Sequence, residues 1–177
     1  MIQAEVGGAA RVDLGIGVQR RGFMIRDFTL ASNCGEDILI SSFRGRSNLA
    51  VVFLGHSDAM RVFLDDLEQH GCEFSEQDTT IVAVIPCGPE EQTIPIENKP
   101  PILVLYDKTH AVYQLSGATD ENGRPFPLVY LTDRFGEIAA TYAAPGHPMP
   151  PNVAEILSTL DFVNQQCPEC EPPEWPR

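Results

Sequence analysis

The segment 48–71 limits the fold of this chain more than any other stretch. It begins with an almost continuous apolar run over residues 49–54, as in a strand that is covered on both faces of a parallel sheet. Apolar residues then recur at helical spacing, which predicts an amphipathic helix that starts near Asp58 and ends at Gly71. In open α/β sheets, ligands bind beyond the carboxyl ends of such strands and beside helix N-termini. We therefore expect a functional site at the turn 55–60.

Size and charge exclude several classes of function. At 177 residues the chain suits one domain with a substantial core, and its formal net charge is −13. That charge disfavours nucleic acids and anionic membranes as partners. No run approaches the roughly 20 apolar residues that a transmembrane helix needs. The first residues lack the basic start and apolar region of a secretory signal, so a cytoplasmic location is expected.

The order of the remaining elements indicates an α/β fold. The expected segments are strands at 23–30, 38–40, 79–85, 102–106, 128–133 and 137–142, a helical turn at 108–115, and a final helix at 153–163 that Asn152 caps. The order is βαβ, a connecting segment, a β-hairpin and a terminal helix, which is that of a thioredoxin-like domain. We expect a central mixed sheet flanked by helices at 23–166. An N-terminal β extension at 1–22 and an irregular C-terminal tail at 167–177 complete the expected organisation.

Short motifs in this order point to a family. They are DFTL at 27–30, SFRGRSN at 42–48, AVVF at 50–53 and LTDRFGEI at 131–138. In their order and spacing they resemble the redoxin group: the peroxiredoxins (alkyl hydroperoxide reductase/thiol-specific antioxidant proteins) and their thioredoxin-like relatives. The resemblance covers roughly residues 23–163 and implies thiol redox chemistry. It also implies that Pro127, nine residues before Gly136, stands where these proteins carry a cis-proline that faces the active site.

The turn itself departs from that family. A thioredoxin-like member would carry Cys-x-x-Cys near residues 58–61, and a peroxiredoxin would carry Thr-x-x-Cys there with an arginine near Pro127. This chain has Asp-Ala-Met-Arg instead. Thiol chemistry needs a thiolate, which neither Asp58 nor Met60 supplies. Peroxidase activity at the usual position is therefore not expected.

Cys167 and Cys170 are the leading redox candidates because they form the close pair Cys-Pro-Glu-Cys. Two thiols at this spacing can close a disulfide and exchange with a substrate. The pair follows the last predicted helix, however, where the helix dipole and Glu169 favour the neutral thiol. Half of a tetrahedral zinc site and an inert tail turn remain alternatives. The five cysteines do not describe a disulfide framework.

Cys87 follows the predicted strand 79–85, so we expect it at the same sheet edge as the turn 55–60. There it can partner Cys167 or Cys170, or it can be a small buried apolar residue. His56, Ser57 and Asp58 are consecutive and cannot converge as a catalytic triad. Ser57 and Asp58 are expected to cap the helix, and His56 is either a general base or a surface residue.

Two functional hypotheses follow. In the first, the chain is a peroxiredoxin-like thiol–disulfide oxidoreductase with atypical thiols at Cys167 and Cys170, with Cys87 as a further candidate. In the second, it is a non-catalytic thioredoxin-like module that binds a protein or small ligand at the turn. The binding residues would then be His56, Ser57, Asp58, Met60 and Pro127. We expect no cofactor, a thiol or disulfide protein as partner or reductant, and leave a homodimer open.

Overall fold

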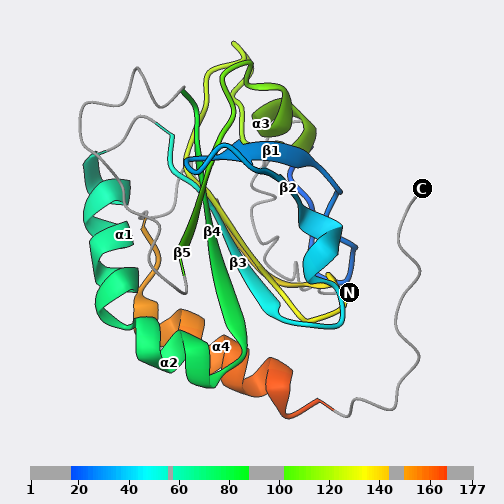
Figure 1. Ribbon diagram of the computed structural model, residues 1–177, viewed down its shortest axis with the longest axis vertical. Helices are drawn as coiled ribbons and strands as arrows, with labels where there is room; N and C mark the ends of the chain where they lie inside the picture. Colours follow the sequence, from blue (N-terminus) through cyan, green and yellow to red (C-terminus); the bar gives the residue numbers. More distant parts are fainter. Residues whose placement is uncertain (1–16, 56–57, 88–101, 144–149, 167–177) are drawn as a thin grey trace, which may run out of the picture.

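The computed structural model describes residues 17–55, 58–87, 102–143 and 150–166. The described residues form a seven-stranded mixed sheet flanked by helices, which confirms the expected α/β architecture (Figure 1). Most of the expected N-terminal extension and the whole tail at 167–177 lie outside the described residues.

The strand order across the sheet is β2-β1-β5-β4-β3-β6-β7. In chain order the elements are β1 Thr29–Ser32, β2 Asp37–Leu39, the 3-10 helix η1 Ile40–Phe43, β3 Asn48–Phe53, α1 Asp58–Gln69, α2 Gly71–Glu76, β4 Thr79–Ile85, β5 Ile102–Tyr106, α3 Ala111–Ser116, β6 Leu128–Thr132, β7 Ile138–Ala143 and α4 Val153–Asn164. The three central strands β3, β4 and β5 are parallel, whereas β1, β6 and β7 run antiparallel to their neighbours. Parallel central strands end at one edge of the sheet, and this edge carries the candidate site.

Both faces of the sheet are covered, which explains why β3 is apolar at nearly every position. Ala50 and Val52 pack into a core with side chains from α1, α2 and α4. Val51 and Phe53 point the other way, into a second core with α3, η1 and the segment that precedes β1. Figure 1 shows α1, α2 and α4 together on one side of the sheet and α3 beyond β1. The expectation of a strand buried on both faces is confirmed, since all six β3 residues are buried.

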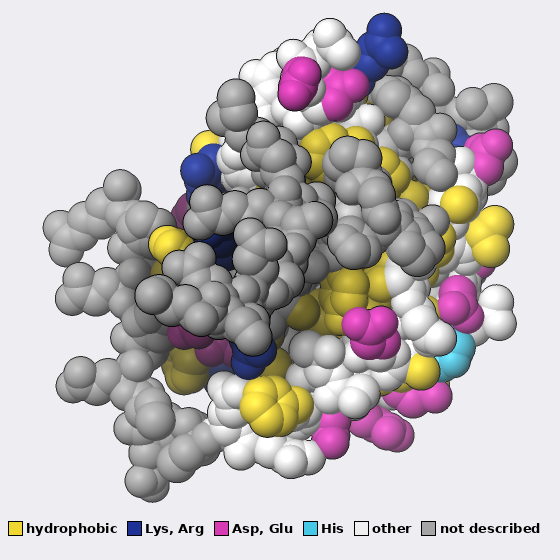
Figure 2. Space-filling model, turned by 180° about the vertical axis from the view of Figure 1, so that it is seen from behind, with side chains coloured by type: hydrophobic (Ala, Val, Ile, Leu, Met, Phe, Trp, Pro, Cys, Tyr) yellow, Lys and Arg dark blue, Asp and Glu magenta, His cyan; other side chains and the backbone are white. Residues whose placement is uncertain are grey.

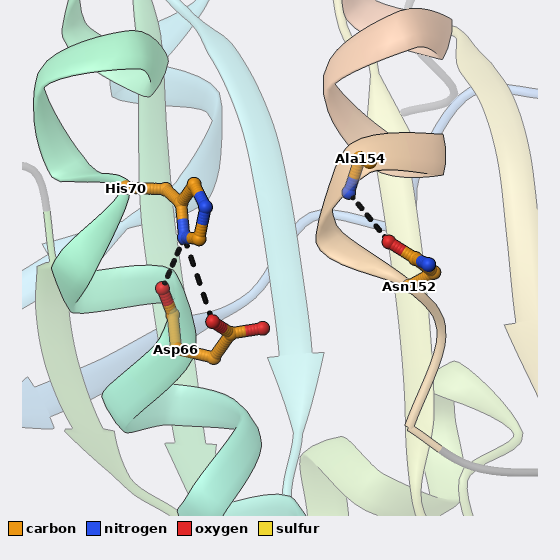
Figure 3. A network of polar contacts seen from close by, with 4 residues as sticks. All are labelled: Asp66, His70, Asn152 and Ala154. Carbon is orange, nitrogen blue, oxygen red and sulfur yellow. Dashed lines mark hydrogen bonds and ion pairs between the residues drawn. The ribbon is translucent and has the colours of Figure 1, made fainter.

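Polar contacts define several helix ends. The Asn152 side chain accepts a hydrogen bond from the Ala154 backbone N–H at 2.8 Å, which confirms it as the N-cap of α4 (Figure 3). At the junction of α1 and α2, His70 Nδ1 lies 2.8 Å from the Asp66 carbonyl oxygen and 3.5 Å from its carboxylate. The hydrogen bond to the Asp66 carbonyl, followed by the charges of Glu73 and Asp66, raises the pKa of His70.

Three sequence-based boundaries are corrected. The predicted strand 23–30 is wrong up to residue 28, because β1 begins only at Thr29. The chain before it bonds to the β6–β7 hairpin, where Ile25 N–H donates to Gly136 O. Gly71 does not end the helical region in a left-handed turn, because it is the first residue of α2. The helix predicted at 108–115 begins only at Ala111, after a turn that a buried aspartate organises.

No helix within the described residues is long and apolar enough to cross a membrane.

Candidate functional site at the carboxyl edge of the central strands

The candidate site is the sheet edge at which β3, β4 and β5 end. Because β4 pairs in parallel with both β3 and β5, the residues that follow Phe53, Ile85 and Tyr106 meet at one edge. β6 runs antiparallel to β3 and pairs Leu128 with Phe53, so the residues just before β6 reach this edge as well. Four separate stretches of the chain therefore converge on the region where the sequence predicts a site.

Gly55 and Pro127 lie close together at this edge. Gly55 has φ of +59°, a conformation that L side chains rarely adopt. A methyl group in place of its hydrogen would lie 3.0 Å from Pro127 Cδ and 3.1 Å from Pro127 N. Only glycine fits this approach without a shift of backbone. Pro127 thus lies directly beside the turn.

The first turn of α1 follows Gly55 but presents few reactive side chains on the surface. Asp58 is exposed and is the first residue of the helix. Met60 is fully buried and belongs to the same core as Phe63 and Leu64. Its side chain therefore supports α1 from the core side and does not form part of the turn's surface, which removes it from the expected binding residues. His56 and Ser57 lie outside the described residues.

Cys87 lies at the same edge, two residues beyond the end of β4. It is partly buried and packs against the core that α1, α2 and α4 cover. Burial, and then the charge of the Cys87 thiolate, raise the pKa of Tyr106. The same charge adds to the burial that raises the pKa of Tyr113. Because Cys87 follows β4, which pairs in parallel with β3 and β5, its position at this edge agrees with the sequence-based expectation.

The backbone that leads to Cys87 is held by three successive hydrogen bonds. Val84 O accepts from the Tyr113 hydroxyl at 2.8 Å, and Ile85 O accepts from Asp107 N–H at 2.9 Å. Pro86 O lies 2.7 Å from His110 Nε2, a contact to a carbonyl oxygen that requires Nε2 to carry its proton. Each donor comes from the stretch 107–113, which we call the clamp. The clamp leaves little freedom in the three residues before the thiol.

A buried carboxylate holds the clamp together. Asp107 is 1% exposed, and its Oδ2 accepts hydrogen bonds from the backbone N–H groups of Val112 at 2.8 Å and Tyr113 at 2.9 Å. These are N–H groups of the first turn of α3, which have no partner within the helix. His110, which lies between Asp107 and Val112 in the chain, has φ of +58°, an uncommon conformation for a residue with a β-carbon. Such strain persists where surrounding contacts fix the backbone, here through the His110 bond to Pro86 O.

The other described cysteines lie away from this edge. Cys72 is exposed on α2, which precedes β4 and lies at the opposite end of that strand. Cys34 is exposed in the turn after β1, near the start of β5, because Asn33 N–H donates to Val104 O. Cys167 and Cys170 lie outside the described residues. Among the residues that the structure describes, Cys87 is the cysteine that reaches the candidate site.

The described residues offer no metal centre: none of their His, Cys, Asp and Glu side chains gather in a group of three or more that could hold an ion. The zinc alternative at Cys167 and Cys170 falls outside those residues. The chemistry that the edge can support is that of a thiol on a rigid backbone, beside a glycine–proline contact.

Sequence reasoning did not single out Asp107, His110 or Tyr113. A signal was present, because Asp107 directly follows the buried strand Ile102–Tyr106 and so had to reach the same edge as Cys87. Its role as a cap for α3 depends on the turn geometry, which residue spacing alone does not give.

Several solved structures share the architecture of this chain. AhpC from Mycobacterium tuberculosis is 15% identical and superposes with a TM-score of 0.65, covering 86% of this chain and 98% of its own. A reduced 2-Cys peroxiredoxin from Plasmodium vivax is 13% identical with a TM-score of 0.69, covering 81% of each chain. The chain has the fold of the peroxiredoxins. A putative thiol:disulfide interchange protein DsbE from Chlorobium tepidum also shares it, at 18% identity, a TM-score of 0.63 and coverage of 82% of this chain and 97% of its own.

The peroxiredoxin fold is established by structure and not by sequence. No protein-family model matches the sequence, and no curated protein matches it. At the identities given above, the likeness shows the fold alone, and the function has to be argued from the residues at the edge.

Proposed function

We propose that this chain is a thiol–disulfide oxidoreductase that uses thiols away from the usual turn. Cys87 is the thiol that meets the substrate, and Cys167 or Cys170 in the tail is its partner. The observation that carries this proposal is the clamp, which holds the carbonyl groups of Val84, Ile85 and Pro86. A reacting sulfur gains from a backbone held near its productive geometry.

The exchange takes place in two steps that balance. The Cys87 thiolate attacks one sulfur of the substrate disulfide; a new S–S bond forms at Cys87, and the substrate S–S bond breaks. The leaving sulfur departs as a thiolate and takes up a proton. A tail thiolate then attacks Cys87 Sγ, which forms a disulfide within the chain and releases the second substrate sulfur as a thiol. The substrate disulfide is reduced and the protein dithiol is oxidised, and an external protein or small-molecule dithiol restores it.

The surroundings of Cys87 are consistent with substrate access from one direction. The residue is partly buried against the core, so its sulfur is neither hidden in the interior nor fully in water. Gly55 and Pro127, in contact at the same edge, provide backbone beside which an extended segment of a substrate protein can lie. The likeness to AhpC and to a putative thiol:disulfide interchange protein agrees with this class of chemistry.

The test is the reduction of glutathione disulfide by the fully reduced protein and by serine variants. Cys87→Ser should abolish the reaction. Cys167→Ser or Cys170→Ser should trap a glutathione adduct on Cys87, which mass spectrometry identifies. The double variant Cys34→Ser/Cys72→Ser is the matched control, because both side chains are exposed and lie away from the edge. It should react like the parent; full activity of Cys87→Ser would contradict the proposed role of Cys87.

A second function is favoured by the first turn of α1. That turn presents exposed Asp58, whereas a redox protein with this fold would carry a cysteine there. In this alternative the chain is a binding module that docks a partner at the vacant turn beside Pro127. The same experiment separates the two functions, because in a binding module Cys87 has no advantage over the exposed Cys34 and Cys72 in its reaction with glutathione disulfide, and Cys87→Ser reacts like the parent.

A further inference from the structure

Charge is distributed unevenly over this acidic protein. Within the described residues, the segments 17–28, 40–47 and 132–138 contain six arginines and three carboxylates, whereas the remainder contains fourteen carboxylates and three cationic side chains. The six arginines are Arg20, Arg21, Arg26, Arg44, Arg46 and Arg134, and all are exposed. On the face that Figure 2 shows, acidic side chains are most numerous at the lower right, whereas dark-blue side chains lie mainly on the left half and at the top, where acidic side chains also occur.

Backbone hydrogen bonds bring these three segments together. Gly45 N–H donates to Arg134 O at 2.7 Å, which puts the arginines on either side of Gly45 next to Arg134. Gly22 N–H donates to Ile138 O at 2.9 Å, and Ile25 N–H donates to Gly136 O at 2.8 Å. The stretch that begins with Arg20 and Arg21 therefore runs beside the hairpin that carries Arg134. We call the surface of these three adjoining segments, 17–28, 40–47 and 132–138, the arginine surface.

Within the described residues, none of the three carboxylates of the arginine surface forms an ion pair with its arginines. Asp27 accepts hydrogen bonds from Ser41 N–H at 2.9 Å and from the Ser41 hydroxyl at 2.7 Å. Asp133 Oδ1 accepts from the backbone N–H groups of Phe135 and Glu137 at 2.9 and 2.8 Å. Four of the arginines take part in no ion pair within the described part of the chain: Arg20, Arg21, Arg46 and Arg134.

An apolar element adjoins these cations. Phe23 is 62% exposed, although a phenylalanine in water forgoes much of the free energy of burial. It borders a hollow of about 710 Å³ lined by residues between 17 and 26, including Arg20 and Arg26. This volume lies within the range of ligand pockets, and aromatic residues, including phenylalanine, and arginine are enriched at protein interfaces.

We propose that the arginine surface docks an acidic peptide segment of a partner protein. Guanidinium groups pair with carboxylates in a forked geometry, and Phe23 with its hollow receives an apolar side chain of the same segment. A long nucleic acid fits less well, because its phosphates meet the repulsion of a protein with net charge −13. The arginine surface is separate from the sheet edge that holds Cys87, so this proposal does not depend on the proposed function.

The probe is a fluorescent, glutamate-rich peptide that contains leucine, and anisotropy measures its binding to the full chain in about 0.15 M salt. Arg46→Glu and Arg134→Glu should each weaken binding about tenfold, because each replaces an attraction with a repulsion. Arg124→Glu is the matched control: it changes the net charge equally, and Arg124 is exposed in a turn outside the arginine surface. It should change binding by about twofold or less. Phe23→Ala should weaken binding about fivefold.

Several results would overturn the proposal. One is the absence of any binding by the parent protein. Another is an equal loss in Arg124→Glu and Arg46→Glu, which would show a response to net charge alone. Equal binding of a peptide with glutamine at every glutamate position would exclude recognition of carboxylates. Tighter binding of single-stranded DNA, or self-association through the acidic helices in place of peptide binding, would assign the arginine surface to a different partner.

Discussion

The turns after β3 and after β4 reach the same sheet edge but are stabilised in different ways. The turn after β3 depends on a close contact, in which Gly55 fits against Pro127 with no room for a β-carbon. The turn after β4 depends on hydrogen bonds, in which the clamp holds the three carbonyl groups before Cys87. The first is the turn that leads into α1 and carries no cysteine over residues 58–61, and the second carries one. The chain therefore keeps the architecture of the peroxiredoxin fold without a cysteine at residues 58–61, and its cysteine at this edge stands on the neighbouring turn.

The largest effect is expected from Asp107→Ala, which removes the carboxylate at the base of the clamp. Two buried backbone N–H groups then lose their acceptor, and the free energy of unfolding should fall by about 3 kcal/mol. Urea denaturation measures this loss. Asp107→Asn is the control, because its amide oxygen still accepts a hydrogen bond, and it should cost about 1 kcal/mol. Equal stability of Asp107→Ala and the parent would show that the clamp does not organise this turn.

Gly55→Ala tests the contact on the other side of the comparison. A β-carbon at φ of +59° is strained and also meets Pro127 at 3.0 Å. The expected loss in free energy of unfolding is about 2 kcal/mol. Gly45→Ala separates the two causes, because Gly45 has φ of +74° but nothing within 4 Å of the added carbon. It should cost about 1 kcal/mol. Equal costs at the two positions would show that the approach of Pro127 adds nothing to the strain at Gly55.

The contrast between these turns marks how far the sequence predicts the structure. The strands β3, β4 and β5 and the cap at Asn152 follow from periodicity and composition, because buried parallel strands and helix ends have local signals. The position of Cys87 near the turn 55–60 also follows from the sequence, because neighbouring parallel strands end at the same edge of a sheet. The clamp does not follow, because Asp107 acts through a buried carboxylate and His110 through a left-handed backbone. No pattern of residue spacing in the sequence predicts either the burial of this carboxylate or the left-handed conformation.

Tyr113→Phe should have a smaller effect than either change above. It removes the hydroxyl that donates to Val84 O but keeps the ring that packs edge-on against Phe53 at 5.1 Å. Val84 O retains its bond from Leu54 N–H at 3.1 Å, so the acceptor is not left without a donor. The free energy of unfolding should fall by about 1 kcal/mol. A loss as large as that of Asp107→Ala would mean that the hydroxyl, rather than the carboxylate, holds the clamp.

The smallest effect concerns pH and lies at the far end of α1. The hydrogen bond to Asp66 O raises the pKa of folded His70 above its ordinary value of 6.5. Protonated His70 therefore stabilises the folded state; this contribution is fully present below pH 6.5 and is lost as the pH rises through the folded pKa. His70→Gln should flatten the stability profile in that window, as urea denaturation at several pH values would show. An unchanged profile would show that His70 does not cause the pH dependence of stability in this window. The reactivity of Cys87 should not depend on this substitution.

The most direct test of the central claim is the order in which the cysteines of the unmodified protein react with glutathione disulfide. Mass spectrometry of quenched samples gives the rate at each site. Cys72 and Cys34 are exposed, whereas Cys87 is partly buried. If accessibility alone governed the rates, the two exposed cysteines would react first. The proposed function predicts that Cys87 forms its mixed disulfide before either of them, because the clamp holds its backbone for attack. Reaction of Cys72 and Cys34 ahead of Cys87 would contradict the claim that the turn after β4 carries the chemistry.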